Sequence, residues 1–69
     1  MKIAYAYVNI EKKFFKFEYY HKDSDGVYEC EKEFDTFENL TEFACWFSDI
    51  NSVPVQFYFS NTYVERRCN

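Results

Sequence analysis

The chain has 69 residues, a net charge of −4 and an aromatic content of 25%. A chain of this length forms a single domain, residues 1–69, and buries only about 60% of its unfolded surface. The negative charge disfavours direct binding of nucleic acid or of an anionic membrane, because both ligands require a cationic surface. The sequence has no run of about 18 apolar residues that would predict a membrane span. We therefore expect a cytoplasmic protein.

The first half of the chain alternates apolar and polar residues at the period of a β-strand. The alternation predicts three strands, at residues 2–10, 14–22 and 27–34. Asp25-Gly26 is a strong hairpin-turn signal, because glycine accepts a positive φ without penalty. Tight turns set Val8 beside Phe15 and Phe15 beside Phe34. Apolar side chains then meet on one face, as a half-buried antiparallel sheet requires.

One amphipathic helix is predicted over the segment 34–47. Asp35 is the expected N-cap, and Glu38 completes a capping box with it. The apolar residues that recur at helical spacing are Phe37, Leu40, Phe43, Ala44 and Phe47. Trp46 falls on the flank of this face, where we expect it to seal the seam between helix and sheet. An exposed Trp46 would instead be a natural interface residue.

A further strand is predicted at residues 53–59, with Pro54 at its start or on a sheet edge. Residues 62–66 form either a separate last strand or the continuation of one long, kinked strand. The predicted fold is α+β. An antiparallel sheet of four to five strands, in the order strand–strand–strand–helix–strand with an optional last strand, carries the amphipathic helix on one face.

A single helix covers only one face of such a sheet, so the aromatic residues of the outer face need another explanation. These residues are Ile3, Tyr5, Tyr7, Phe14 and Tyr20. Tyrosine tolerates half-wet burial and anchors interfaces. The outer face either meets solvent, pairs with a second copy in a homodimer, or binds a different protein.

An acidic row lies on one face of the third strand, formed by Glu29, Glu31 and Glu33. Its spacing of about 6.6–6.8 Å is close to the phosphate repeat of a nucleic acid strand. Glu38 and Glu42 extend the acidic character along the helix. A basic, nucleic-acid-binding protein could therefore bind this acidic surface in place of its nucleic acid ligand. The alternative is a solvated face that Lys16 partly neutralises.

The residue pattern predicts no catalytic, cofactor or metal site, and therefore no enzyme. His21 is expected to pack at the rim of the sheet. The three cysteines, Cys30, Cys45 and Cys68, have no metal-like spacing. We expect them to be reduced, with two of them packed as small hydrophobic residues.

The motif Phe34-Asp35-Thr36-x-Glu38-x-Leu40 leading into Trp46-Phe47, together with the order of the elements, resembles the small phage-encoded anti-CRISPR proteins. The resemblance is to the type I-F inhibitors, whose sheet precedes a Phe-Asp-Ser-x-Glu-x-Leu helix start and a Trp-Phe pair. It spans residues 2–47 in pattern. It implies a phage protein in the host bacterial cytoplasm that binds a subunit of a CRISPR surveillance complex and performs no chemistry.

The first hypothesis is therefore a non-enzymatic inhibitor that covers a basic surface of a CRISPR effector or of another host defence complex. The candidate partner-binding residues are Tyr5, Tyr7, Tyr20, Glu29, Glu31, Glu33, Glu38 and Glu42. Two alternatives remain open: an acidic immunity protein or antitoxin that neutralises a basic toxin, and a homo-oligomeric structural or regulatory domain.

Overall fold

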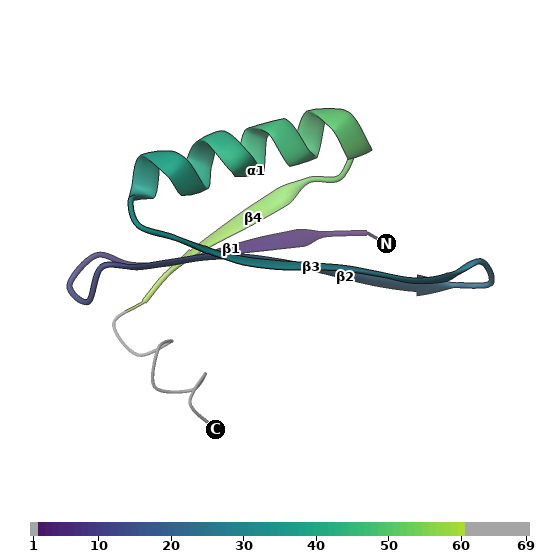
Figure 1. Cartoon of the computed structure of the whole chain (residues 1–69), viewed down its shortest axis with the longest axis horizontal. Coiled ribbons are helices and arrows are strands. Elements are labelled where there is room, and N and C mark those ends of the chain that lie inside the picture. Colours follow the sequence, from purple (N-terminus) through teal and green to yellow (C-terminus); the bar gives the residue numbers. More distant parts are fainter. Residues whose placement is uncertain (1, 61–69) are drawn as a thin grey trace, which may run out of the picture.

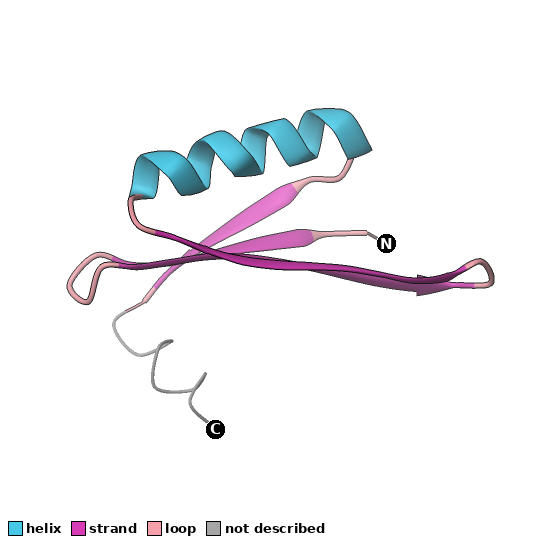
Figure 2. Ribbon diagram, in the orientation of Figure 1, coloured by secondary structure: helices cyan, strands magenta, loops and turns pink. Residues whose placement is uncertain are grey.

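The computed structural model describes residues 2–60, which form one four-stranded sheet and one helix (Figure 1). The elements are β1 (Ala4–Asn9), β2 (Phe14–Asp23), β3 (Gly26–Phe34), α1 (Phe37–Asn51) and β4 (Val55–Phe59). The strand order in the sheet is β3-β2-β1-β4, and α1 runs over one face (Figure 2). The predicted α+β fold is confirmed. No helix among the described residues is long and apolar enough to cross a membrane.

The predicted registers of the three-stranded meander are confirmed. Val8 pairs with Phe15, and Phe15 pairs with Phe34. The β2–β3 turn is a two-residue loop closed by Asp23 and Gly26, and Gly26 has a φ of 141°. That backbone conformation is open to glycine and strained for most other residues. The β2–β3 hairpin projects beyond β1, whose pairing with β2 stops at Tyr19 (Figure 1).

The sheet differs from the prediction in one pair of strands, because β4 runs parallel to β1. Helix α1 connects the end of β3, at one edge of the sheet, to the start of β4, at the other edge. Such a crossover makes β4 parallel to β3, and hence also to β1. Pro54 stands just before β4 on the sheet edge, as expected, and its carbonyl accepts a hydrogen bond from the N–H of Ala4 at 2.9 Å.

The core lies between α1 and the sheet. Its central residue is Phe17, which is 0% exposed, and its ring centroid lies 5.0 Å from that of Phe43 and 4.8 Å from that of Phe47. The neighbouring β1 residues Ala4 and Ala6 are fully buried. Their small side chains leave room for the phenyl rings of the helix, so large side chains of α1 pack against small side chains of β1.

The N-cap of the helix lies one residue later than predicted, and the helix ends at Asn51 rather than at Phe47. Thr36 is the N-cap, and its Oγ1 accepts a hydrogen bond from the N–H of Asn39 at 3.1 Å. Asp35 therefore lies outside the cap, and the predicted capping box with Glu38 is wrong. Asp35 and Thr36 both have side chains that can cap a helix. The N-cap residue itself has extended backbone and is followed by helix, and Thr36 has that conformation (φ −135°, ψ 156°).

We expect Thr36→Ala to lower the free energy of unfolding by about 1 kcal/mol, because one helix-terminal N–H loses its acceptor. Asp35→Ala is the matched control and should change stability by less than about 0.5 kcal/mol. Urea unfolding followed by circular dichroism measures both values. A larger loss for Asp35→Ala than for Thr36→Ala would restore the predicted cap.

One other prediction for the helix is corrected by the structure. Trp46 does not seal the seam, because its side chain is 56% exposed and it contacts the ring of Phe43 at 5.6 Å. Cys45 is also exposed, whereas Cys30 is partly buried beside the core. Neither of these two cysteines forms a disulfide. Cys68 and the predicted strand at 62–66 lie outside the described residues.

Candidate protein-binding surface

The sheet face opposite α1, which we call the open face, is covered by no helix or strand of residues 2–60 (Figure 1). Strand registers align its side chains in lines that run across the sheet. One line passes from β4 to β3 through Tyr58, Tyr7, Lys16 and Glu33. The next passes through Gln56, Tyr5, Glu18 and Glu31. The face is thus aromatic over β4 and β1 and acidic over β2 and β3.

The aromatic half is a stack of three tyrosine rings, Tyr5, Tyr7 and Tyr58, which we call the tyrosine cluster. Tyr58 lies 5.7 Å from each of the other two ring centroids, and Tyr5 lies 6.2 Å from Tyr7. Tyr58 is 42% exposed, and the other two are half-buried. Stacked rings restrain one another, so the cluster offers an apolar platform with phenolic hydroxyl groups.

Sequence reasoning placed Tyr5 and Tyr7 on this face and missed Tyr58. The alternation of Tyr58 with Phe57 and Phe59 was visible. The sequence does not indicate that β4 pairs with β1, and it is this pairing that places Tyr58 against Tyr5 and Tyr7. Tyr20, the remaining predicted tyrosine, is exposed on the same face but stands on the projecting hairpin, outside the cluster.

Lys16 lies between the aromatic and acidic halves. Although it is a lysine, it is only 4% exposed, and its Nζ lies 2.8 Å from Oε2 of Glu31. The carboxylates of Glu29, Glu31 and Glu33, which we call the glutamate row, share this face with Glu18. One buried ammonium group therefore stands among four acidic residues, and it neutralises part of their charge, as the sequence analysis allowed.

A surface hollow lies within the acidic half, lined by residues of β2 and β3. Its polar lining comes from Glu18, Tyr20, Glu29 and Glu31. The phenol of Tyr20 and the carboxylates beside it suit a cationic side chain, which gains from ion pairing and from the face of an aromatic ring.

The structure does not bring all eight predicted partner-binding residues together. Tyr5, Tyr7, Tyr20 and the glutamate row share the open face. Glu38 and Glu42 are exposed on α1, which lies on the other side of the sheet. A partner that docks flat on the open face therefore has no direct contact with these two helix carboxylates.

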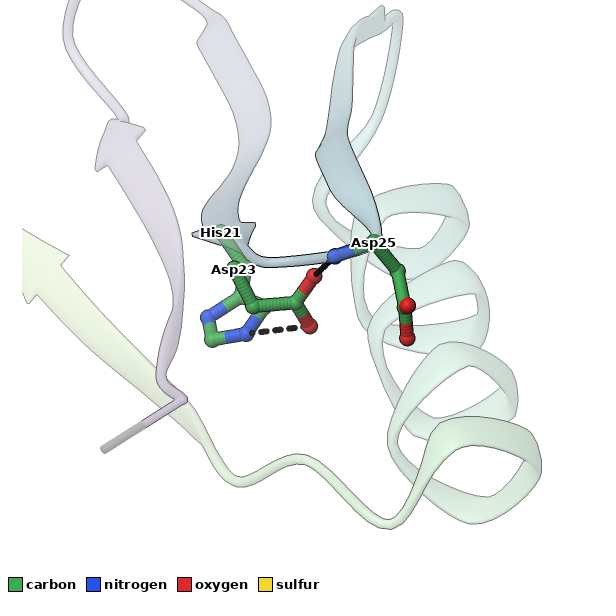
Figure 3. A network of polar contacts seen from close by, with 3 residues as sticks. All are labelled: His21, Asp23 and Asp25. Carbon is green, nitrogen blue, oxygen red and sulfur yellow. Dashed lines mark hydrogen bonds and ion pairs between the residues drawn. The ribbon is translucent and has the colours of Figure 1, made fainter.

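His21 packs at the sheet rim as expected, with its ring 6.3 Å from that of Tyr28. Its Nε2 lies 3.3 Å from Oδ2 of Asp23, and Oδ1 of Asp23 accepts a 2.8 Å hydrogen bond from the N–H of Asp25 (Figure 3). The hydrogen bond from Asp25 is the main reason that the pKa of Asp23 is lowered from 3.8, and the charge of His21 contributes less. These contacts hold the hairpin turn together.

Because the pKa of Asp23 is lower in the folded than in the unfolded chain, its contribution to stability is complete at neutral pH. That contribution is lost as the pH falls below 3.8 and through the lower folded value. We expect the side-chain carboxyl carbon shift of Asp23 to titrate with a midpoint below 3.8, measured by NMR. Asp23→Asn is the control and should abolish this titration. A midpoint at or above 3.8 would contradict the assignment.

Among residues 2–60, no group of three or more His, Cys, Asp or Glu side chains is arranged to hold a metal ion. Comparisons of the chain with protein-family models, with curated proteins and with solved structures gave no significant match. The open face is therefore the feature of the molecule from which a function can be inferred.

Proposed function

We propose that the protein is a non-enzymatic inhibitor that binds another protein through its open face and covers a basic, nucleic-acid-binding surface of that partner. The observation that carries the proposal is the side-by-side arrangement of the tyrosine cluster and the glutamate row on one sheet face, which no helix or strand of residues 2–60 covers. Interfaces combine aromatic anchors with charged residues that select the partner.

The two halves of the face have different roles in this proposal. Three strand spacings separate β4 from β3, so the face is roughly 14 Å wide. The tyrosine cluster supplies apolar area that a partner removes from water, which gives affinity. The glutamate row supplies a negative potential that speeds the encounter with a basic surface and disfavours acidic partners. The carboxylate spacing of about 6.6–6.8 Å along β3 matches the interval at which such a surface meets phosphates.

The target class that we propose is a CRISPR effector or another host defence complex that binds nucleic acid, with the inhibitor acting in the bacterial cytoplasm. The motif from Phe34 to Phe47 supports this choice, because the type I-F inhibitors begin their helix in a similar way. The acidic open face supports it independently, because such complexes hold nucleic acid in basic channels.

The test is inhibition of target-DNA binding by a purified type I-F surveillance complex, measured by gel shift at increasing inhibitor concentration. We expect Tyr58→Ala and the double variant Glu29→Gln/Glu33→Gln each to weaken inhibition at least tenfold, which is about 1.4 kcal/mol. The matched controls are Tyr28→Ala, an exposed tyrosine on the helix side of β3, and Glu38→Gln/Glu42→Gln on α1.

Equal inhibition by the open-face variants and the helix variants would contradict the proposed surface. Absence of inhibition by the wild-type protein would contradict the CRISPR target. In that case, sedimentation at micromolar concentration decides the next step, because a dimer that Tyr58→Ala dissociates would assign the open face to self-association.

A further inference from the structure

Strand β3 is one of the two outer strands of the sheet formed by residues 2–60. In a two-residue hairpin the residues that flank the turn exchange hydrogen bonds, and the pairs then alternate along the strands. Asp23 and Gly26 are the flanking pair, so Tyr28 and Cys30 bond toward β2. Val27 and Glu29, at alternate positions, direct their N–H and C=O groups away from β2, toward the outer edge.

The side chains on the two sides of this edge differ in chemistry. On the open face, Glu29 begins the glutamate row. On the helix side, Phe43 packs against Phe34 of β3 at 5.3 Å, and Trp46 packs on Phe43 at 5.6 Å. The exposed indole of Trp46 therefore stands on the β3 flank of α1, next to the outer edge of the sheet.

We propose that β3 accepts an extended segment of a partner protein as a fifth strand, with lysine or arginine at alternate positions and apolar residues between them. The basic side chains would lie on the open face beside the glutamate row, where opposite charges on neighbouring strands attract. The apolar side chains would lie on the helix side, where they cover Trp46. Backbone hydrogen bonds to the β3 edge provide the rest of the affinity.

A second copy of the chain is a poorer occupant of the same edge. Antiparallel pairing of two β3 strands would set glutamates of one row beside glutamates of the other, and like charges in that position are destabilising. Lys32, whose Nζ lies 5.8 Å and 5.7 Å from the ring centroids of Phe34 and Phe43, places a further charge on this outer strand. Charged residues on an outer strand commonly prevent self-pairing in this way.

This inference shares the glutamate row with the proposed function, but it adds the β3 edge and Trp46 and makes no use of the tyrosine cluster, so the two can fail separately. The probe is a synthetic peptide of alternating lysine and valine, capped at both ends. We expect its binding to slow hydrogen exchange of the Val27 and Glu29 amides, measured by NMR, and to shift the emission of Trp46, the one tryptophan of the chain, to shorter wavelength.

Two control peptides and two variants of the protein make the test decisive. The same peptide with every backbone nitrogen methylated keeps its charge but loses all its backbone donors, and we expect at least tenfold weaker binding. A glutamate–valine peptide should not bind. Trp46→Ala should weaken binding of the lysine–valine peptide about tenfold, whereas Tyr58→Ala should leave it unchanged. Equal binding of the N-methylated peptide, unchanged exchange at Val27 and Glu29, or equal binding of the acidic peptide would overturn the inference.

Discussion

Replacing Phe17 by alanine is expected to remove most of the free energy of unfolding at 25 °C. Phe17 is 0% exposed and touches both Phe43 and Phe47 of the helix. Truncation of a buried phenylalanine costs about 3–5 kcal/mol, through lost burial and through the cavity that remains. Small domains have total stabilities of about 5–15 kcal/mol, and a chain of this length lies at the low end.

Urea unfolding, followed by far-ultraviolet circular dichroism and by the emission of Trp46, measures the loss for Phe17→Ala. Phe59→Ala is the matched control, because Phe59 is 64% exposed at the end of β4. We expect its midpoint to stay near that of the wild-type protein. Equal midpoints for the two variants would show that the core does not centre on Phe17.

The second large effect is expected at Lys16, where methionine keeps the length of the apolar stem but removes the charge. Lys16→Met leaves Glu31 without the ammonium group that lies 2.8 Å away, among three other carboxylates on the same face. We expect a loss of about 1–3 kcal/mol in the free energy of unfolding, since hydrogen bonds to charged groups contribute in this range. The exposed lysine Lys13 provides the control Lys13→Met, which should change stability by less than about 0.5 kcal/mol.

A double-variant cycle separates the ion pair from the other roles of Lys16. Lys16→Met/Glu31→Gln should lose less stability than the sum of the two single variants, because either single change already removes the attraction. About 1 M salt should reduce the loss in Lys16→Met by screening the remaining carboxylates from one another. Additive losses in the cycle would contradict the contribution of the pair.

The registers of the meander were predictable from the sequence because two constraints agree. A one-residue shift would move every side chain of a strand to the opposite face of the sheet. Only one register therefore places Val8, Phe15 and Phe34 together on the same face. The short turn at Asp25-Gly26 selects the same alignment. The tyrosines of β1 and the glutamate row followed from these registers, and the structure places them as expected.

Features that depend on distant parts of the chain were not predictable in the same way. Nothing within Val55–Phe59 specifies that β4 pairs with β1, so Tyr58 and the parallel pair were missed. The separation of Glu42 from the open face follows from the position of α1 on the sheet. Asp35 and Thr36 are adjacent and can both cap a helix. The backbone conformation decides which of them is the N-cap, and residue type alone does not distinguish them.

The parallel pairing of β1 with β4 also sets an order for the assembly of the fold. The β1–β2 and β2–β3 contacts join neighbours in the chain and form quickly, whereas β4 reaches β1 only after the whole helix has crossed the sheet. Closing that long loop costs chain entropy before the contacts form. Among the amides that are hydrogen-bonded within the sheet, we therefore expect those of β4 to exchange hydrogen fastest, and we expect β4 to detach first when the protein opens. Tyr58 would separate from Tyr5 and Tyr7 together with β4. Local opening would therefore disrupt the tyrosine cluster, whereas the glutamate row on β3 would keep its arrangement.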